Sequence, residues 1–358
     1  MRVLLAGGGS AGHVSPLLAL ADRLVADDPS TDVLALGTAA GLEARLVPSR
    51  GYDLYEIPRV PLPRRLGPDA VRLPGNLRAA VHSTRSAIRR VEAQVVVGFG
   101  GYVSAPAYLA ARQARVPIVV HEQNSRPGFA NRLGARMTSW VAVTFPGTPL
   151  PHAVRTGLPL RPEISTLDRA ARRVDARKHF GLAPDPLTVL VFGGSLGAQR
   201  LNEVVPQLAS DFGVRGVQVL HVCGEGKDVA VTSGDFSYVV VPYVDAMDLA
   251  YAAADVAVCR AGANTVSELT ALGIPAVYVP LPIGNGEQRL NVEPVVAAGG
   301  GVLIDDASLT PQRLRTDLLP LLDDPARLAQ MGTAASSFGV LDADRRLADM
   351  VRQAVGGS

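Results

Sequence analysis

The chain has 358 residues, and its 47% hydrophobic and 19% charged content is that of a protein with packed cores rather than a disordered chain. Its two cysteines, Cys223 and Cys259, stand inside apolar runs, so buried thiols are expected and a disulfide framework is excluded. No apolar run approaches the roughly 20 residues of a membrane span, and the N-terminus reaches its glycines too soon for a signal peptide. A soluble, intracellular protein is therefore expected.

The net charge of +2 conceals an asymmetry between the two halves of the chain. Residues 1–160 carry 18 arginines against 10 acidic residues, whereas residues 161–358 carry 17 basic against 23 acidic residues. The excess positive charge of the first half concentrates in residues 58–90. This segment is either a solvated loop and helix face or a patch for an anionic lipid surface. Aromatic residues are not interleaved there, so nucleic-acid binding is not indicated. Only Asp69 opposes the arginines of this segment, which are Arg59, Arg64, Arg65, Arg72, Arg78, Arg85, Arg89 and Arg90.

Short β-branched apolar runs alternate with amphipathic stretches along the chain, which predicts an α/β protein with parallel sheets. In the first half, strands are expected at 2–6, 32–37, 94–99, 117–121 and 140–145, and helices near 14–26, 77–91, 103–114 and 128–137. In the second half, strands are expected at 188–194, 218–223, 238–244, 255–260 and 275–281, and helices near 198–210, 246–253, 263–272 and 287–298. Proline and charge cluster over 158–186, which is the expected linker.

Each half opens with the same unit of strand, glycine-rich turn and helix, at residues 6–13 and 192–199. Two doubly wound domains facing each other across a cleft would place both turns at the carboxyl ends of strands, where such sheets bind ligands. This is the outline of the two-domain glycosyltransferase architecture called GT-B.

The first turn matches the GxGxxG dinucleotide fingerprint through Gly7, Gly9 and Gly12. A dinucleotide site also needs an acid near the end of the second strand, and that strand ends in Leu36-Gly37-Thr38. A nicotinamide enzyme is therefore not favoured. His13 follows the turn directly and is either a helix-start packing residue or a general base.

The second half offers backbone amides for a diphosphate at two helix starts, one after Gly193-Gly194-Ser195 and the other at Gly262-Ala263. No GxxxxGK[ST] sequence is present, so ATP or GTP hydrolysis has no support. No HExxH or CxxC spacing occurs, so no dedicated metal site is expected. Together these features suit a nucleotide sugar.

Seven segments, in this order, resemble the MurG family of peptidoglycan glycosyltransferases in glycosyltransferase family 28. The segments are GGGSAGHVSP (7–16), GFGGYVSAP (98–106), HEQNSRPGFANR (121–132), TGLPLR (156–161), GGSLGAQRLN (193–202), CRAGANTVSEL (259–269) and GEQRLN (286–291). The resemblance implies inverting transfer of N-acetylglucosamine from UDP-GlcNAc to the C4 hydroxyl of the muramyl sugar in lipid I, which forms lipid II. The chain departs from the common family pattern at Ser10, Leu158, Leu196 and Glu287.

The resemblance also assigns roles to individual residues. His13 corresponds to the catalytic base, Glu268 to the ligand of the ribose hydroxyls, and Gln288 to a ligand of the donor sugar. The segment from Tyr243 to Met247 corresponds to the uracil site. The donor-binding residues are thus Arg161, Ser195, Val244, Met247, Gly262, Ala263, Thr265, Glu268, Glu287 and Gln288, and the acceptor or cleft residues are Gly9, Ser10, Ala11, Gly12, Tyr102 and Asn124.

Several of these positions also have plain structural readings from the residues alone. Asn124 can simply cap the turn after its strand, and Glu122 is expected on the opposite face. Glu268 without its AGANTVSE context would be an exposed helix acid, and Arg161 a surface residue near the linker.

The implied domains are residues 1–160 on the acceptor and membrane side, residues 161–340 for the UDP-sugar, and a C-terminal helix at 341–358 that packs back on the first domain. The implied location is the cytoplasmic side of the cell membrane, as a peripheral protein. The implied partners are UDP-GlcNAc, the lipid-linked acceptor, the anionic membrane surface and other cell-wall synthesis proteins, with no nucleic acid and no required cofactor. Alternatives are a glycosyltransferase with a glycolipid or natural-product acceptor, a UDP-GlcNAc 2-epimerase, and a non-catalytic nucleotide-sugar-binding scaffold.

Overall fold

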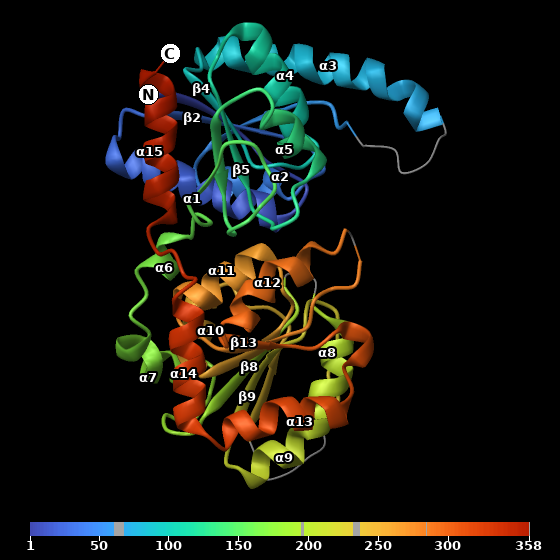
Figure 1. The fold of residues 1–358 in the computed structure, drawn as a ribbon, viewed down its shortest axis with the longest axis vertical. Coiled ribbons are helices and arrows are strands. Elements are labelled where there is room, and N and C mark those ends of the chain that lie inside the picture. Colours follow the sequence, from blue (N-terminus) through green and yellow to red (C-terminus); the bar gives the residue numbers. More distant parts are fainter. Residues whose placement is uncertain (61–67, 195–196, 232–236, 284, 358) are drawn as a thin grey trace. The chain divides into compact units, whose positions relative to one another are not determined.

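The computed structural model describes residues 1–60, 68–194, 197–231, 237–283 and 285–357, and it divides into two compact units (Figure 1). Unit 1 comprises Met1–Arg161 and Asp342–Ser358, and unit 2 comprises Pro162–Leu341. Each unit is built on a parallel sheet with helices on its faces, so the predicted pair of doubly wound α/β domains is confirmed.

Unit 1 contains a seven-stranded parallel sheet with the strand order β3-β2-β1-β4-β5-β6-β7. Its strands are Arg2–Ala6 (β1), Asp32–Gly37 (β2), Asp53–Glu56 (β3), Val95–Gly98 (β4), Ile118–Glu122 (β5), Trp140–Val143 (β6) and Ala153–Arg155 (β7). Its helices are Ala11–Asp27 (α1), Glu43–Ser49 (α2), Pro68–Val91 (α3), Ser104–Ala114 (α4), Phe129–Gly134 (α5) and Ala343–Gly356 (α15).

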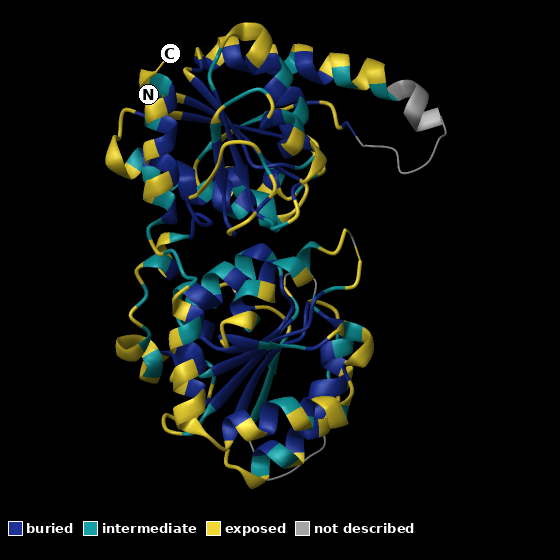
Figure 2. Cartoon of the chain, in the orientation of Figure 1, coloured by how far each residue is buried: buried dark blue, intermediate teal, exposed yellow. Residues whose placement is uncertain are grey.

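The two faces of this sheet pack against different helices because successive side chains of a strand point to opposite faces. Leu4 joins the core beneath α3 and α4, whereas Leu5 joins the core beneath α1 and α15. The C-terminal helix α15 contributes Leu347 and Val351, both fully buried, and its Arg352 pairs with Asp27 of α1. Figure 2 shows the strands as buried, with exposed positions on the outer helix faces.

Unit 2 contains a six-stranded parallel sheet with the strand order β10-β9-β8-β11-β12-β13. Its strands are Thr188–Phe192 (β8), Gln218–Val222 (β9), Tyr238–Val241 (β10), Val256–Cys259 (β11), Ala276–Tyr278 (β12) and Gly301–Leu303 (β13). Its α-helices are Pro162–Ser165 (α6), Arg169–His179 (α7), Gln199–Val204 (α8), Ala209–Val214 (α9), Met247–Ala253 (α10), Ala263–Ala271 (α11), Glu287–Ala297 (α12), Pro311–Leu322 (α13) and Pro325–Ser336 (α14). Two 3₁₀ helices cover Val205–Leu208 (η1) and Asp306–Ser308 (η2).

The carboxyl ends of the central strands have the same arrangement in both sheets. In unit 1, Ala6 at the end of β1 pairs with Leu36 of β2 and with Gly98 of β4. In unit 2, Phe192 at the end of β8 pairs with Val222 of β9 and Cys259 of β11. In each sheet the strand order reverses at this point, and the loops that follow the two central strands diverge to leave room for a ligand.

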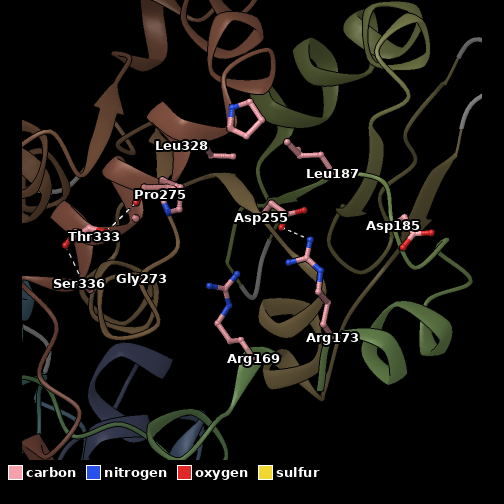
Figure 3. Close-up of a pocket in the computed structure, with 13 residues that line it drawn as sticks. Arg169, Arg173, Asp185, Leu187, Asp255, Gly273, Pro275, Leu328, Thr333 and Ser336 are labelled. Carbon is pink, nitrogen blue, oxygen red and sulfur yellow. Dashed lines mark hydrogen bonds and ion pairs between the residues drawn. The ribbon is translucent and has the colours of Figure 1, made fainter. Parts of the chain in front are cut away.

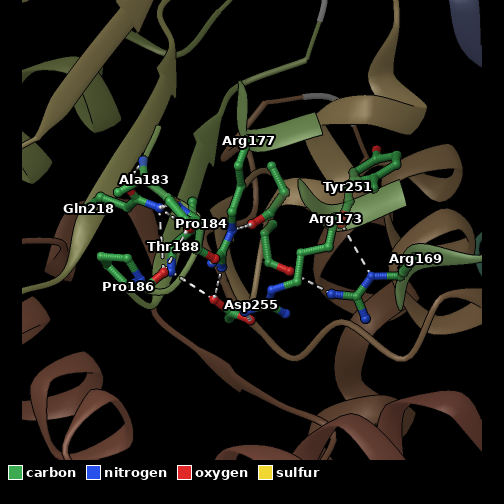
Figure 4. A network of polar contacts seen from close by, with 12 residues as sticks. Arg169, Arg173, Arg177, Ala183, Pro184, Pro186, Thr188, Gln218, Tyr251 and Asp255 are labelled. Atoms are coloured by element: carbon green, nitrogen blue, oxygen red, sulfur yellow. Dashed lines mark hydrogen bonds and ion pairs between the residues drawn. The ribbon is translucent and has the colours of Figure 1, made fainter. Parts of the chain in front are cut away.

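Helix α7 lies inside the segment 158–186, which the sequence predicts as linker. Its sequence RAARRVDARKH has no apolar stripe, so local pattern does not reveal it. The helix is instead anchored by arginines (Figure 4). Arg177, whose side chain is fully buried, donates from Nη2 to Asp255 Oδ2 over 2.8 Å, and Arg173 donates from Nη2 to Asp255 Oδ1 over 2.5 Å.

Arg169 completes this anchor by donating to three backbone carbonyls. Its Nε, Nη1 and Nη2 lie 3.2, 3.1 and 2.5 Å from the oxygens of Tyr251, Leu272 and Ala254. These carbonyls belong to the last turns of α10 and α11, whose final C=O groups lack partners within their own helices. A cationic side chain at a helix C-terminus is also favourable for the helix dipole. The arginines of α7 therefore replace the missing apolar stripe.

Replacing Asp255 by alanine leaves the buried Arg177 guanidinium without its counter-ion. We expect a loss of about 3–5 kcal/mol in the free energy of unfolding, measured by urea denaturation. Asp323→Ala is the matched control because its ion pair with Arg215 is exposed, and it should cost less than about 1 kcal/mol. Equal losses in the two variants would contradict the assignment of Asp255 as the anchor.

Candidate functional site

The first glycine turn joins β1 to α1 across Gly7–Ser10. Gly9 adopts a φ of +85°, in the left-handed region that side chains rarely adopt. Ser10 is the N-cap residue of α1, yet its side chain makes no capping hydrogen bond to the helix. Its Oγ lies 2.9 Å from Nδ1 of His13 instead. The turn therefore uses its hydroxyl to orient an imidazole.

The His13 side chain is half-buried at this turn. Desolvation by the surrounding protein lowers its pKa below the usual value of 6.5. A hydrogen bond to the Gly8 carbonyl and the charge of Glu43 act in the opposite direction and raise the pKa of His13. A largely neutral imidazole near neutral pH is the form that can accept a proton.

The turn after β4 packs directly on the first turn. A Cβ on Gly101 would lie 2.4 Å from the Gly8 carbonyl oxygen, and one on Gly100 would lie 3.1 Å from Nε2 of His13. Ser104 joins the two turns, because its Oγ accepts from the Gly100 amide at 2.8 Å and lies 2.9 Å from the Ala6 carbonyl oxygen. The glycines of GFGGY therefore allow the imidazole and the second turn to approach each other.

A buried polar network lies on the other side of Gly100. Asn131 Nδ2 lies 3.4 Å from a Cβ built on Gly100, and it donates to Glu122 Oε2 at 3.0 Å. Glu122 Oε1 accepts from the Asn124 amide at 2.9 Å, and burial raises the pKa of this carboxyl. The expectation that Glu122 faces away from Asn124 is therefore wrong, because the chain turns back over the carboxylate after β5 ends at Glu122.

Tyr102 stands beside the first turn and is 37% exposed, which leaves its ring accessible. The guanidinium carbon of Arg59 lies 5.1 Å from the centre of this ring, a cation–π contact. The structure thus brings the predicted acceptor-side residues to one edge of unit 1: Gly9, Ser10, Ala11, Gly12 and His13 in one turn, and Tyr102 and Asn124 in the two loops around Gly100.

Sequence reasoning missed Glu43, Glu122 and Asn131 as members of this region. Glu122 and Asn131 belong to the HEQNSRPGFANR segment, so their signal was present in a motif. Glu43 is the first residue of α2, a helix that the sequence did not indicate. Its carboxylate accepts from the Gly9 amide at 2.9 Å.

In unit 2 the corresponding glycine turn follows β8. A Cβ on Gly193 would lie 2.2 Å from the Ala198 amide nitrogen, and one on Gly197 would lie 2.1 Å from the Cys223 carbonyl oxygen. Both positions therefore require glycine for close backbone approach. Ser195 and Leu196 lie outside the described residues, so the predicted diphosphate contact of Ser195 remains a prediction.

The turn after β11 opens onto space at the start of α11. Gly262 is the N-cap of this helix, and a Cβ built on it meets no atom within 4 Å. Ala263 and Thr265 belong to the first turn of α11, where free amides favour an anion. Glu268, one turn further on, is half-buried, and its Oε2 accepts from the Tyr251 hydroxyl at 2.7 Å. The buried Tyr251 thus orients a carboxylate that is still accessible.

Gln288 lies opposite the end of β11 at the start of α12. Its Oε1 accepts from the amides of Ala261, at 3.1 Å, and Leu281, at 2.9 Å. The side-chain NH₂ is therefore the group that would meet a sugar. Glu287 Oε2 accepts from the Asn285 amide at 3.1 Å.

The remaining donor-side predictions fall in two places. Val244 is buried just before α10, and Met247 is the first residue of that helix. Arg161 is the last residue of unit 1, and its grouping with the donor residues remains a prediction.

A cavity of about 560 Å³ lies at the other edge of the unit 2 sheet (Figure 3). Leu187, Asp255 and Pro275 line it, and they immediately precede β8, β11 and β12. Its cations are already engaged, Arg169 with three carbonyls and Arg173 with Asp255. The predicted donor residues follow the carboxyl ends of the strands and do not line this cavity. It therefore belongs to the α7 anchor rather than to the candidate site.

Two negative findings apply to the described part of the chain. It holds no group of three or more His, Cys, Asp or Glu residues arranged to bind a metal ion. None of its helices combines the length and the apolar character needed to cross a membrane.

The family models and the curated relatives that match this chain agree on one family. Residues 3–143 match the glycosyltransferase family 28 N-terminal domain, and residues 188–347 match the glycosyltransferase family 28 C-terminal domain. A Streptomyces avermitilis protein named UDP-N-acetylglucosamine--N-acetylmuramyl-(pentapeptide) pyrophosphoryl-undecaprenol N-acetylglucosamine transferase is 56% identical over 358 residues, covering 99% of both chains. A protein of the same name from Leifsonia xyli subsp. xyli is 57% identical over 349 residues, covering 98% of this chain and 97% of its own.

Solved structures show the same relationship. The crystal structure of Acinetobacter baumannii MurG superposes with a TM-score of 0.80 at 30% identity, covering 98% of this chain and 99% of its own. UDP-GlcNAc 2-epimerase from Neisseria meningitidis, bound to UDP-GlcNAc, has a TM-score of 0.71 at 12% identity, covering 99% and 100% of the two chains. At that identity the epimerase shares the fold alone.

Proposed function

The chain belongs to the MurG family within glycosyltransferase family 28, and we propose that His13 is the base with which it transfers N-acetylglucosamine from UDP-GlcNAc to lipid I. The C4 hydroxyl of the muramyl sugar attacks the anomeric carbon from the face opposite UDP. The new C–O bond forms as the bond to the diphosphate oxygen breaks, so the configuration inverts from α to β. The hydroxyl proton passes to His13, and UDP leaves with the electron pair.

The geometry of His13 is the observation that supports this role. Ser10 Oγ lies 2.9 Å from Nδ1, and the Gly8 carbonyl accepts a hydrogen bond from the ring, so two neighbours of the turn hold the imidazole in place. A Cβ on Gly100 would lie only 3.1 Å from Nε2, so this position needs glycine for the ring to fit. A neutral imidazole held in a fixed direction beside the predicted acceptor turn is what a general base requires.

The donor is assigned to unit 2. Glu268, held by Tyr251, would accept from both ribose hydroxyls, since one carboxylate offers two oxygens. The start of α11 at Gly262, Ala263 and Thr265 would face the diphosphate and stabilise the charge that develops on departing UDP. Further donor contacts are assigned to Ser195 and Arg161 for the diphosphate side, Val244 and Met247 for uracil, and Glu287 and Gln288 for the sugar.

The acceptor is assigned to the edge of unit 1 around Gly9–Gly12, with Tyr102 and Asn124. The lipid tail of this acceptor requires a membrane surface nearby. Arg78, Arg85 and Arg89 are exposed along α3, and Arg85 and Arg89 are separated by one helical turn. This basic face would lie against the anionic cytoplasmic leaflet of the cell membrane as a peripheral contact. The predicted contributions of Arg64 and Arg65 lie outside the described residues.

Three variants separate the base from the donor site in an assay of UDP release with a lipid I analogue. His13→Ala should lower kcat about 10²–10⁴-fold and leave UDP affinity unchanged, because the base acts only on the acceptor hydroxyl. Glu268→Ala should raise the donor KM, and Tyr251→Phe should do so more weakly, because it removes only the hydrogen bond that orients Glu268.

Unaltered turnover in the His13 variant would sink the base assignment, and an unaltered donor KM in the Glu268 variant would remove its ribose role. Sugar epimerisation without acceptor, in place of acceptor-dependent UDP release, would contradict the transferase itself.

Membrane docking is tested by co-sedimentation with vesicles that contain anionic lipid. Each basic residue near such a surface contributes about 1 kcal/mol, so the double variant Arg85→Ala/Arg89→Ala should bind about 30-fold more weakly at low salt. The matched control is Arg172→Ala/Arg327→Ala, which removes two exposed arginines of unit 2. High salt should weaken wild-type binding by screening. Equal losses in both variants, or binding indifferent to anionic lipid, would reject docking through α3.

A further inference from the structure

The carboxylate of Glu43 fills the inside of the first glycine turn. Glu43 is the first residue of α2 and is only 1% exposed. Its Oε2 accepts from the Gly9 amide at 2.9 Å, and its Oε1 accepts from the amide and the hydroxyl of Thr38 at 3.0 and 2.9 Å. Three donors therefore converge on one buried carboxylate, and they lower its pKa against the opposing effect of burial. The group is ionised.

The space for this carboxylate is built by glycines from three directions. A Cβ on Gly8 would lie 2.5 Å from Glu43 Oε1, one on Gly37 2.4 Å from Glu43 Cγ, and one on Gly41 2.1 Å from Glu43 Oε2. A larger residue at any of the three positions would push the carboxylate out. The sequence thus reserves this space for a particular buried anion.

The position of the Glu43 carboxylate indicates that the first turn does not bind a phosphate through the Gly9 amide. A glycine turn between a strand and a helix commonly offers its amides to a phosphate. Here the Gly9 amide already donates to an internal carboxylate that comes from just beyond the end of β2. Dinucleotide-binding proteins place an acid in that part of the fold to bind ribose. In this chain the acid turns inward and occupies an amide that a substrate phosphate would use.

We propose that Glu43 is a positioning residue for the base: it takes the place of a bound phosphate against the Gly9 amide and thereby fixes the turn that carries Ser10 and His13. The proposal rests on the proposed function of His13. The negative charge also favours the imidazolium that forms when His13 accepts the acceptor proton.

The other groups around His13 do not supply this charge. Ser10 and the Gly8 carbonyl are neutral, and so is Asn131, which lies beyond Gly100. Glu122 is hydrogen-bonded to Asn131, and its own pKa is raised by burial. In the described chain, the charge of Glu43 is the one that raises the pKa of His13, and Glu43 is joined to the turn that carries His13 through the Gly9 amide.

The test replaces Glu43 by glutamine, which keeps the shape and removes the charge. His13 is titrated directly by NMR of the histidine rings, with its signal assigned by its absence in His13→Ala, and kcat, both KM values and the pH profile are measured. Asp22→Asn is the matched control: Asp22 of α1 pairs with Arg50 and Tyr52 next to α2, so its loss loosens the same helix pair without touching the turn.

We expect the pKa of His13 to fall in Glu43→Gln, because the variant removes a nearby negative charge that favours the protonated ring. The sign follows from the lost anion, which stabilised the protonated ring. The acid limb of the kcat profile should move to lower pH by the same amount, kcat should fall about tenfold because the base is weaker and less well held, and the donor KM should stay unchanged. The Asp22 variant should change only thermal stability.

Glu43→Asp keeps the charge but shortens the side chain by one methylene. It should restore the wild-type pKa of His13 and only part of kcat, and it serves as the test if the glutamine variant does not fold. A His13 pKa and a pH profile identical to wild type in Glu43→Gln, with only a lower melting temperature, would overturn the proposal. Full turnover in His13→Ala would instead refute the base assignment, and the NMR shift would still report whether Glu43 sets the protonation of His13.

Discussion

The Glu43 carboxylate, which accepts from the Gly9 amide and from Thr38, joins three parts of unit 1, namely the turn after β1, the segment after β2 and the start of α2. Because a buried carboxylate without donors is costly, the three donors and the anion stabilise one another. The turn after β4 then packs on this fixed backbone, with Gly101 against the Gly8 carbonyl. The direction of the His13 ring, whose Nδ1 lies 2.9 Å from Ser10 Oγ, depends on that arrangement.

Unit 2 repeats the topology of unit 1, but its glycine turns are arranged differently. Both central strands, β8 and β11, are followed by glycine turns, as in unit 1. At α11, however, no carboxylate of the described residues fills the helix start, and a Cβ on Gly262 would meet no atom within 4 Å. The acid of this unit, Glu268, lies one turn along the helix and is held by Tyr251 rather than by backbone amides. Unit 1 thus fills one of its turns with its own carboxylate, whereas Gly262 of unit 2 faces open space.

The fold could be predicted largely from sequence because the strands of a parallel sheet are buried on both faces and appear as short apolar runs such as Arg2–Ala6 and Thr188–Phe192. The edge strands β3, β7 and β13 were missed because they are short and, in β7, exposed. Helix α7 was missed because its stability depends on Asp255, which is distant in sequence. Glu43 was missed for the same reason, since nothing near it in the sequence indicates that it meets Gly9. Residues in the glycine-rich motifs were easier to predict, because a glycine turn and the residues beside it are adjacent in the sequence.

The central claim is that the base and the donor are held by separate glycine turns, one in each unit. Hydrogen–deuterium exchange of the whole protein, with and without UDP, tests it most directly. UDP should slow exchange in peptides covering residues 259–271 and 281–291, where the α11 start, Glu268 and Gln288 lie, because a bound ligand stabilises the closed state from which amides do not exchange. Peptides covering residues 7–16 and 38–46 should exchange as in the free protein, because the Gly9 amide is already bound to Glu43. Protection of residues 7–16 by UDP, with none in residues 259–271, would contradict the account.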